Sequence, residues 1–233
     1  MKISIEKEVF KKFHPQFQVA FILFKGIDNK TRLKESKELL KDVEKVVRLT
    51  FNKDSVKTHH LISPWNVAKQ EFGKEAKHYH TSVELLLKSV LSKKKVAVND
   101  VLTNLIRYLA LKQIIPIGID DPQKIEGEMV FSIAGTSGEE KNKFNGIKNL
   151  SKGELYYHDQ KKVLGTKLDY WKNEKTKLTA KSTSALVHFE ALPPFGSEQL
   201  IQLLKEAVDL IRSFCGGEVK VFVLNKNNLS TEL

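Results

Sequence analysis

Apolar residues in the first half of the chain follow one strand pattern and then helical spacing. Residues 17–24 form a β-rich apolar run that ends at Gly26, which predicts a mostly buried strand. After Asn29, apolar residues recur every three or four positions between lysines and acids, which predicts a long helix capped by Asn29. Its apolar positions are Leu33, Leu39, Leu40, Val43, Val46, Val47 and Phe51.

Three further helix starts follow, each marked by capping residues. Ser63 before Pro64 predicts the first of them. Thr81 and Glu84 form a capping box that predicts the second, and Asn99 is the expected cap of the third. The expected apolar stripes are Leu85, Leu86, Val90 and Leu91 in the second helix, and Val101, Leu102, Leu105, Ile106 and Leu109 in the third.

Strand patterns dominate the second half of the chain. The predicted strands are residues 114–117, 129–133, 154–158, 162–164, 185–191 and 218–224. Between the last two, Ser197 is expected to cap a long amphipathic helix that ends at Gly216. The mixture of elements, without a linker or repeat, predicts a single α+β domain over residues 1–224, with a mixed β-sheet core flanked by helices. Residues 225–233 are expected to form a flexible tail.

The net charge of the chain indicates what kind of partner to expect, which the pattern of elements does not. The 233 residues include 39 lysines and arginines against 28 acids, which gives a net charge of +11. Nearly all of the cations are lysines, which suit contacts with phosphates better than reading of bases. Nucleic acid is therefore an expected partner, and the alternative is a lysine-rich composition with ordinary solvated faces.

The lack of recognisable targeting signals and the single cysteine lead us to expect a cytoplasmic protein. No apolar run reaches the roughly 18–20 residues that a bilayer span needs, so no membrane association is expected. The first residues lack the apolar core and cleavage site of a secretory signal. The one cysteine, Cys215, cannot form an internal disulfide, which fits a reducing compartment.

Familiar catalytic and cofactor motifs do not occur in the sequence. It has no phosphate-binding Gly-x-x-x-x-Gly-Lys loop, no Gly-x-Gly-x-x-Gly turn and no Gly-x-Ser-x-Gly turn. The histidine pairs His59-His60 and His78–His80 match no zinc spacing. Cys215 lies at a predicted helix C-terminus, where it is expected to be a small buried residue rather than a nucleophile. No metal and no cofactor are therefore expected.

Residues 170–179 combine aromatic, basic and hydroxyl side chains between two predicted strands. Their sequence is Tyr-Trp-Lys-Asn-Glu-Lys-Thr-Lys-Leu-Thr. Such interleaving is typical of single-stranded RNA binding, in which bases stack on rings and phosphates lie on ammonium groups. The alternative is a solvated loop in which Trp171 fills the core.

Several short segments, in order, resemble those of one known family. They are Ser63-Pro64-Trp65, Asn104 within residues 102–105, residues 116–120, residues 124–127, residues 174–179 and Leu192-Pro193-Pro194. The chain resembles the tRNA-editing domain of the phenylalanyl-tRNA synthetase β subunit, and more closely its freestanding relatives, from about residue 63 to residue 217. The fold implied is that of the editing domain. The synthetase's catalytic core has no counterpart here, so aminoacylation is not expected.

The resemblance implies hydrolysis of a mischarged aminoacyl-tRNA. It implies catalytic roles for Glu174, Ser182 and Asn104, where Glu174 corresponds to a glutamate that selects the amino acid. It places Gly118, Trp171, Thr176 and Thr179 in the substrate pocket, and Gly118 stands where the synthetase has a histidine. The lysines expected to bind tRNA are Lys172, Lys175, Lys177 and Lys181, with Lys93, Lys94 and Lys95 as a second patch.

Three functions follow as hypotheses. The first is a trans-acting hydrolase that deacylates mischarged tRNA, since an activated ester requires only a positioned water and a stabilised oxyanion. The second is a tRNA- or RNA-binding module of the same fold without catalysis, which the missing histidine favours. The third is a hydrolase of small amino-acid esters or amides, which the net charge of +11 disfavours.

Overall fold

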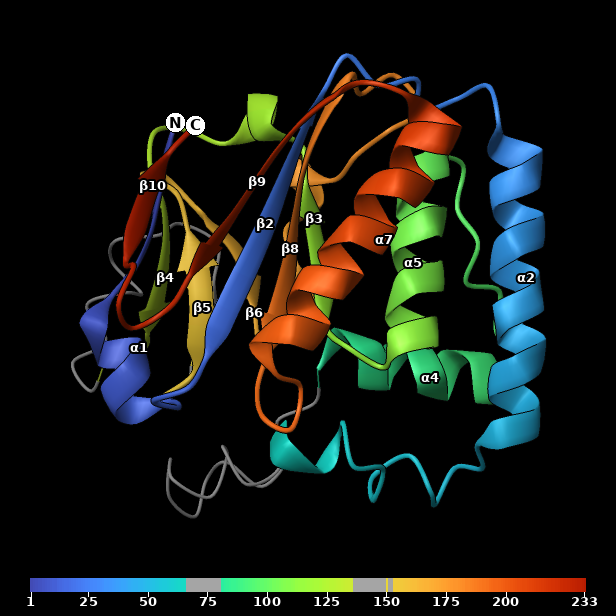
Figure 1. The fold of residues 1–233 in the computed structure, drawn as a ribbon, viewed down its shortest axis with the longest axis horizontal. Coiled ribbons are helices and arrows are strands. Elements are labelled where there is room, and N and C mark those ends of the chain that lie inside the picture. The colour runs from blue at the N-terminus through green and yellow to red at the C-terminus, as the bar shows by residue number, and fades with distance from the viewer. Residues whose placement is uncertain (66–80, 136–149, 151–152) are drawn as a thin grey trace.

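The computed structural model describes residues 1–65, 81–135, 150 and 153–233. Two β-sheets pack face to face, and helices cover the outer face of one sheet (Figure 1). This arrangement is a single domain that mixes helices and strands, so the predicted α+β class is confirmed.

The first sheet is mixed and has six strands in the order β10-β1-β4-β5-β6-β7. Strands β1 and β4 pair in parallel, and the other neighbours are antiparallel. The strands are β1 (Lys2–Ile5), β4 (Met129–Ile133), β5 (Leu155–His158), β6 (Val163–Thr166), β7 (Trp171–Lys172) and β10 (Ser230–Glu232). The predicted strand at 129–133 and the hairpin of β5 and β6 are thereby confirmed.

The second sheet has four antiparallel strands in the order β3-β8-β2-β9. They are β2 (Gln18–Lys25), β3 (Ile117–Asp120), β8 (Ser184–Ala191) and β9 (Glu218–Leu224). One face of this sheet lies against the helices and the other against the six-stranded sheet, which is why the apolar run at residues 17–24 has no polar face.

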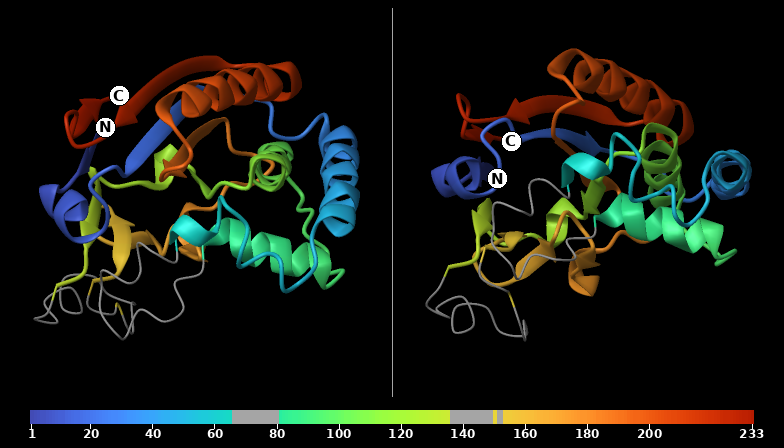
Figure 2. Two further views of the ribbon diagram at one scale, coloured as in Figure 1. Left: turned by 60° about the horizontal axis from the view of Figure 1, so that its bottom comes forward. Right: turned by 90° about the horizontal axis from the view of Figure 1, so that it is seen from below.

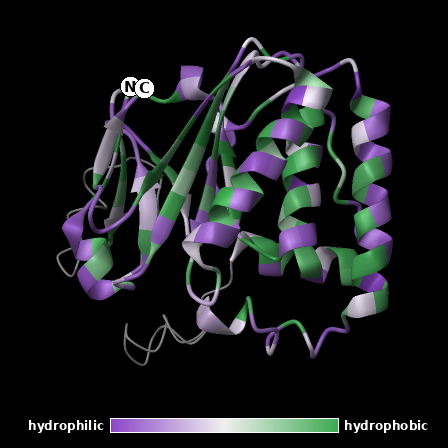
Figure 3. Ribbon diagram, in the orientation of Figure 1, coloured by the Kyte–Doolittle hydropathy of each residue, from purple (hydrophilic) through white to green (hydrophobic). Residues whose placement is uncertain are grey.

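Two helices cover the outer face of the four-stranded sheet, and two more pack around them. Figures 1 and 2 show α5 and α7 against the sheet and α2 at the edge of the molecule. Along α2, hydrophilic and hydrophobic residues are banded, whereas α4 and α5 are mostly hydrophobic (Figure 3). The helices are α1 (Lys7–Lys12), α2 (Leu33–Thr50), α4 (Ser82–Leu91), α5 (Val101–Gln113) and α7 (Ser197–Cys215), with short 3₁₀ turns η1 (Pro122–Lys124) and η2 (Glu174–Thr176).

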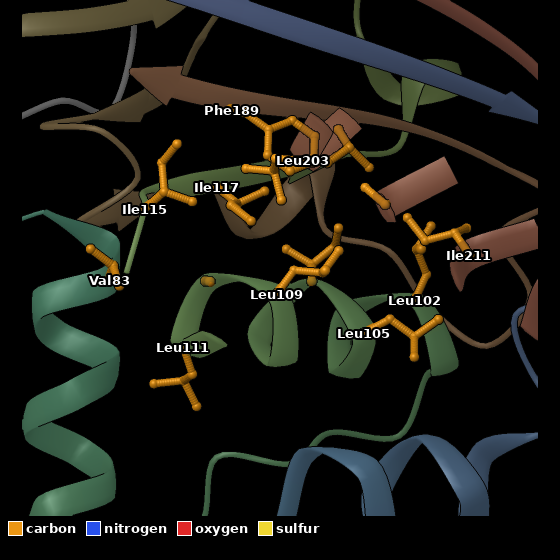
Figure 4. Close-up of a cluster of buried hydrophobic side chains, with 14 of the residues drawn as sticks. Val83, Leu102, Leu105, Leu109, Leu111, Ile115, Ile117, Phe189, Leu203 and Ile211 are labelled. Atoms are coloured by element: carbon orange, nitrogen blue, oxygen red, sulfur yellow. The ribbon is translucent and has the colours of Figure 1, made fainter. Parts of the chain in front are cut away.

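The main apolar core lies between the four-stranded sheet and helices α5 and α7. Figure 4 shows Leu109 of α5 directed toward the sheet, with Phe189 and Ile117 on the sheet side. Because each fully buried side chain of this size contributes roughly 1.5–3 kcal/mol, this cluster is the principal source of the domain's stability.

Helix α4 begins where its capping box predicts but buries a different stripe. The hydroxyl of Thr81 accepts a hydrogen bond from Glu84 N at 3.4 Å. The buried positions are Val83, Leu87 and Val90, whereas Leu85 is 41% exposed. The predicted stripe is therefore confirmed at Val90, and Leu86 and Leu91 pack half-buried against the core, but it was wrong at Leu85. The centre of the buried face is shifted toward Val83 and Leu87.

The predicted N-cap residues of α2 and α5 were both wrong. Asn29 does not cap α2, whose cap residue is Arg32. The buried Asn29 amide oxygen instead accepts a hydrogen bond from Leu102 N at 2.7 Å, at the start of α5. Asp100, rather than Asn99, caps α5 with its carboxylate. The segment before α2 passes over the start of α5, so the Asn29 amide accepts a hydrogen bond from a free backbone N–H group of that helix.

Helix boundaries elsewhere shift by one to three residues from the prediction. Ile114 adopts a left-handed conformation with φ of 53°, which ends α5 and delays the next strand to Ile117. Ser197 is the first residue of α7, and Gly196 is its cap. Gly216 ends α7 with φ of 66°, as predicted.

The C-terminal residues 225–233 are not a flexible tail. Residues 230–232 form β10, which pairs antiparallel with β1, and Leu233 N donates to Met1 O at 2.9 Å. Leu229 and Leu233 also pack against the apolar cluster between the sheets. The expectation of a tail was wrong because β1 offers an unpaired edge that a polar segment can satisfy through its backbone alone.

Candidate functional site: a cleft that ends on a buried charge cluster

A cleft of about 890 Å³ lies between α4, α5, β3 and the segment from Asp169 to Leu178; we call it the α4–β7 cleft. Apolar side chains from three elements form much of its lining, including Val83, Leu86, Ile106, Ala110, Ile117 and Ile119. Cationic side chains also line it, namely Lys95, Arg107, Lys172, Lys175 and Lys177. An apolar lining with a few polar groups is the usual character of a ligand site.

Two aromatic side chains contribute to one wall of the cleft. Tyr170 is 38% exposed and Trp171 is 43% exposed, and both line the cavity. Trp171 therefore does not fill the core. Exposed rings beside lysines are suited to stacking with nucleobases.

A turn with unusual backbone conformation leads into this wall. Lys167, Leu168 and Asp169 follow one another with φ values of 51°, 56° and 60°. Left-handed conformations cost non-glycine residues roughly 1–2 kcal/mol each, and such strain is concentrated at functional sites. The turn directs the Asp169 carboxylate toward the space between the two sheets, where Tyr157 Oη donates to it at 2.5 Å.

Six polar side chains form what we call the inter-sheet cluster. They come from β3, β5, the β6–β7 turn, β7 and β8, and all are buried or nearly so. They are Asp120, Tyr157, Asp169, Lys172, His188 and Glu190. Of these, Asp169 and Lys172 also line the α4–β7 cleft, so the cluster forms one end of it.

His188 lies at the centre of the cluster with acceptors on both ring nitrogens. Nδ1 is 2.6 Å from Glu190 Oε1. Nε2 is 3.3 Å from Tyr157 Oη and 3.6 Å from Asp169 Oδ2. Burial acts to lower the pKa of His188, but the charges of Glu190 and Asp169 outweigh it and raise this pKa above its ordinary value. For the Glu190 carboxyl group, burial disfavours the negative charge and so raises the pKa.

Lys172 supplies the counter-charge from the other side. Its ammonium group contacts Asp120 Oδ2 and Tyr157 Oη closely, and lies 3.5 Å from Asp169 Oδ2. The side chain is 13% exposed. Burial and the neighbouring carboxylates raise the pKa of Tyr157 well above its ordinary value, so its hydroxyl keeps its proton and acts as a donor.

Two glycines provide the space that the cluster occupies. Gly118 is paired with His188 across β3 and β8, and a Cβ atom at position 118 would lie 2.0 Å from the His188 ring. A Cβ at Gly165 would lie 2.4 Å from Asp169 Oδ1. Gly118 therefore has a positive structural role: its missing side chain admits the imidazole of the neighbouring strand.

The structure separates the three residues expected to be catalytic. Glu174 lines the α4–β7 cleft at η2, but its side chain is 80% exposed and paired with Lys177. Asn104 is fully buried in α5, where its amide bonds Ser36 Oγ and both backbone groups of Val98. It does not line the cleft, and its contacts are those of a structural amide.

Ser182 also lies away from the cleft. Its hydroxyl donates to Asp121 Oδ2 at 2.8 Å and accepts from Thr179 N at 3.1 Å, which closes a turn before β8. Glu174, Ser182 and Asn104 thus do not share the cleft, because each belongs to a different local structure. Their collinear order in the sequence did not specify their separation in space.

The expected pocket residues divide in the same way. Trp171 lines the cleft, whereas Thr176 is buried with its hydroxyl on Asn173 O at 3.3 Å. Thr179 is exposed and belongs to the turn that Ser182 closes. Gly118 lies behind the cleft, against His188.

The lysines expected to bind tRNA are not equivalent. Lys172 forms ion pairs with Asp120 and Asp169 in the inter-sheet cluster and is not a surface cation. Lys175 and Lys177 line the cleft and are exposed, and Lys181 is exposed in the turn that follows. In the second patch, Lys93, Lys94 and Lys95 are all exposed, and Lys95 lines the cleft.

The remaining candidates from the sequence are Cys215 and the histidine pairs. Cys215 is buried, and burial raises the pKa of its thiol to about 12, which agrees with its expected apolar role. Among the described residues, no group of three or more His, Cys, Asp or Glu side chains is placed to hold a metal ion. His78 and His80 lie outside the described residues.

Sequence reasoning missed most of the cluster. Asp120, Tyr157, Asp169, His188 and Glu190 were not candidates, although His188 and Glu190 lie in an otherwise apolar strand. Two ionisable residues on the same face of a buried strand are a signal that could have identified them, since buried charges require partners.

The fold and site together define an α+β domain with a basic-rimmed cleft that ends on buried charges. Residues 64–216 match the B3/4 domain family, a domain found in the phenylalanyl-tRNA synthetase β subunit. This match covers more than half of the chain, so the chain belongs to the B3/4 domain family. The family suggested by the sequence resemblance is confirmed.

One solved structure similar to the chain is an N-terminal fragment of the phenylalanyl-tRNA synthetase β subunit from Pyrococcus horikoshii. The identity is 12% and the TM-score is 0.44. The similarity covers 93% of this chain and 49% of that one, so the chain spans about half the length of that structure. No curated protein matches the chain. None of the described helices is long and apolar enough to cross a bilayer.

Proposed function

We propose that this protein deacylates mischarged aminoacyl-tRNA in trans and that the α4–β7 cleft binds the aminoacylated end. The observation that carries the proposal is the composition of one cavity. Its apolar lining, the exposed Tyr170 and Trp171, and the lysines Lys95, Lys175 and Lys177 together suit an amino acid, a terminal base and phosphates.

The reaction is hydrolysis of the ester between the amino acid and the terminal ribose. The oxygen of water forms a bond to the carbonyl carbon, the bond from this carbon to the ribose oxygen breaks, and a proton passes to that oxygen. The ester is already activated, so positioning of water and stabilisation of the developing oxyanion suffice. Glu174, which is exposed on the rim and paired with Lys177, would contact the entering tRNA rather than the buried end of the cleft.

A panel of mischarged tRNAs tests this function. Purified protein is added in trans, and the amino acid that remains esterified is followed over time against buffer alone. We expect accelerated release from at least one member of the panel. Trp171→Ala should weaken binding and raise KM, whereas Leu49→Ala, at a position 88% exposed on α2, should leave both constants unchanged.

The ionic-strength dependence of binding tests the role of the rim. Contacts between lysines and phosphates release counterions, so tRNA affinity should fall steeply as salt rises. Lys175→Ala should reduce the slope of this dependence by about one, and Lys34→Ala, at a position 91% exposed on α2, should not change it.

Two results would replace the proposal. If all mischarged tRNAs remain intact while salt-dependent binding is present, the protein is a tRNA-binding module. If small amino-acid esters are hydrolysed but tRNA is not bound, it is a small-molecule hydrolase.

A further inference from the structure

We propose that Asp169, backed by the buried carboxylates of the inter-sheet cluster, binds the free α-ammonium group of the aminoacyl ester. The cleft would therefore select substrates whose amine is unblocked. This inference rests on the proposed function and adds a recognition element to it.

The first argument is the charge balance of the cluster. The cluster holds three carboxylates, Asp120, Asp169 and Glu190, against one ammonium, Lys172, and one imidazole, His188. Even with a positive charge on His188, these formal charges are three negative against two positive. The resulting net formal charge of −1 in a buried setting favours an additional cation.

The second argument is that two buried carboxylate oxygens have no partner among the described residues. They are Asp120 Oδ1 and Glu190 Oε2, and both residues are fully buried. Buried acceptors are nearly always satisfied, so two orphan oxygens show that the cluster's own donors do not fully compensate its carboxylates. Neither Asp120 nor Glu190 lines the cleft, so a cation held at Asp169 would offset their charge through space rather than by a hydrogen bond.

The third argument is access. Of the three carboxylates, Asp169 lines the α4–β7 cleft, beside the Lys172 side chain, so it is the carboxylate that an entering cation can contact. Lys172 contacts Asp120 more closely than Asp169, from which it is 3.5 Å away, and this leaves Asp169 Oδ2 able to accept a further hydrogen bond. The left-handed turn at residues 167–169 holds Asp169 in this position.

Glu174 is a weaker candidate for the same role. It also lines the cleft, but its carboxylate is 80% exposed and already paired with Lys177. An ion pair in water contributes little to affinity, whereas the same pair next to a buried negative charge contributes much more. Glu174 therefore serves as the matched control for Asp169.

The experiment compares three esters of the same tRNA. They carry the best amino acid from the panel, its N-acetyl derivative and its α-hydroxy acid counterpart, which replaces the ammonium by a neutral hydroxyl without added bulk. Each rate is divided by the uncatalysed rate in buffer, because the amine also affects the intrinsic reactivity of the ester. We expect the corrected kcat/KM for the free amine to exceed both others by about 10- to 100-fold, as expected for a charge-assisted hydrogen bond.

Variants then assign this preference to a residue. Asp169→Asn should reduce the ratio between amino and hydroxy esters to near one, whatever its effect on the rate for the hydroxy ester. Glu174→Gln should leave the ratio unchanged. Circular dichroism and thermal melting establish that each variant is folded. If Asp169→Asn does not fold, the wild-type ratio decides whether the ammonium is recognised, and Glu174→Gln decides whether the exposed rim recognises it.

The outcomes separate the two proposals. Equal corrected rates for amino and hydroxy esters would overturn ammonium recognition while leaving deacylation intact. A preference that Glu174→Gln abolishes and Asp169→Asn preserves would move the site to the rim. Absence of release from every ester would overturn the proposed function itself.

Discussion

The two faces of strand β8 are both buried but have opposite chemistry. On one face, Ala185, Val187, Phe189 and Ala191 join the apolar core beneath α5 and α7. On the other face, Leu186 is followed by His188 and Glu190, which face the six-stranded sheet. The same strand thus supports the fold with one face and holds ionisable groups with the other.

This difference indicates which side of the sheet is not optimised for stability alone. Apolar side chains of similar volume would be as stable as a buried ion cluster, or more stable, because desolvation offsets much of the electrostatic gain. The cluster also requires the glycines at 118 and 165 and the left-handed turn that ends at Asp169. Stability alone does not account for these features, whereas the proposed role of the cluster at the end of a substrate cleft does.

The largest expected effect on stability comes from the apolar face. Phe189→Ala removes a fully buried ring, and it should lower the free energy of unfolding by about 3–5 kcal/mol. Urea denaturation followed by circular dichroism measures this change. Ile201→Ala, at a position 51% exposed on α7, is the control and should alter stability by less than about 0.5 kcal/mol. Similar losses for both variants would contradict the assignment of the core.

A slightly smaller loss is expected from breaking the charge cluster. Lys172→Met leaves Asp120 and Asp169 without their cation, so it should destabilise the domain by about 3 kcal/mol. Lys177→Met removes the cation of an exposed pair and should change stability by less than about 1 kcal/mol. Parallel urea titrations compare the two variants, and equal effects would mean that the cluster is solvated rather than buried.

Gly118→Ala tests the contact between β3 and β8 on the charged face. The new methyl group would meet the His188 ring, so the ring must move, at an expected loss of about 1–3 kcal/mol. Gly196→Ala is the control, since the nearest atom to a Cβ there is 3.8 Å away. Under the proposed function, the change should also lower the rate of deacylation, because the displaced ring disturbs the cluster at the end of the cleft. Unchanged stability and rate would show that His188 can reorient freely.

The smallest expected effect concerns the pH dependence of stability. The pKa values of His188 and Glu190 are raised above their ordinary values of 6.5 and 4.5, so the folded state binds protons more tightly than the unfolded state. The stabilisation from His188 is complete below about pH 6.5 and is lost as pH rises through the folded-state pKa. Raising a pKa by one stabilises the protonated folded state by about 1.4 kcal/mol.

His188→Gln provides the comparison for this pH effect. The stability difference between wild type and variant should shrink above pH 6.5 as His188 loses its proton beside Glu190, Asp169, Asp120, Tyr157 and Lys172. Urea titrations between pH 6 and pH 9 measure this difference. A difference that does not vary with pH would mean that His188 is neutral throughout.

Much of the fold was predictable because its signals are local. The apolar run at 17–24, the capping box at Thr81 and the glycine at 216 each act within a few residues. The C-terminal strand was not predictable in this way. Its residues are polar, and they form a strand because β1, more than 200 positions away, offers a free edge.

For the candidate site, too, local signals were predictive and long-range contacts were not. The segment that contains Trp171, Lys175 and Lys177 was identified from its composition, and the structure places all three on the cleft. Asn104 and Ser182 were chosen by their order along the chain, and both turned out to satisfy local backbone groups. Composition predicts what a surface can bind, but the order of residues does not predict which of them meet.

The inter-sheet cluster depends on tertiary structure throughout. Gly118 lies opposite His188 through strand register, and Asp169 reaches the same space from another sheet through a left-handed turn. Periodicity along the chain specifies which residues are buried, because burial of apolar area depends on local spacing. It does not specify which buried charges are neighbours, because their interaction depends on distances of a few ångströms between strands that are remote in sequence.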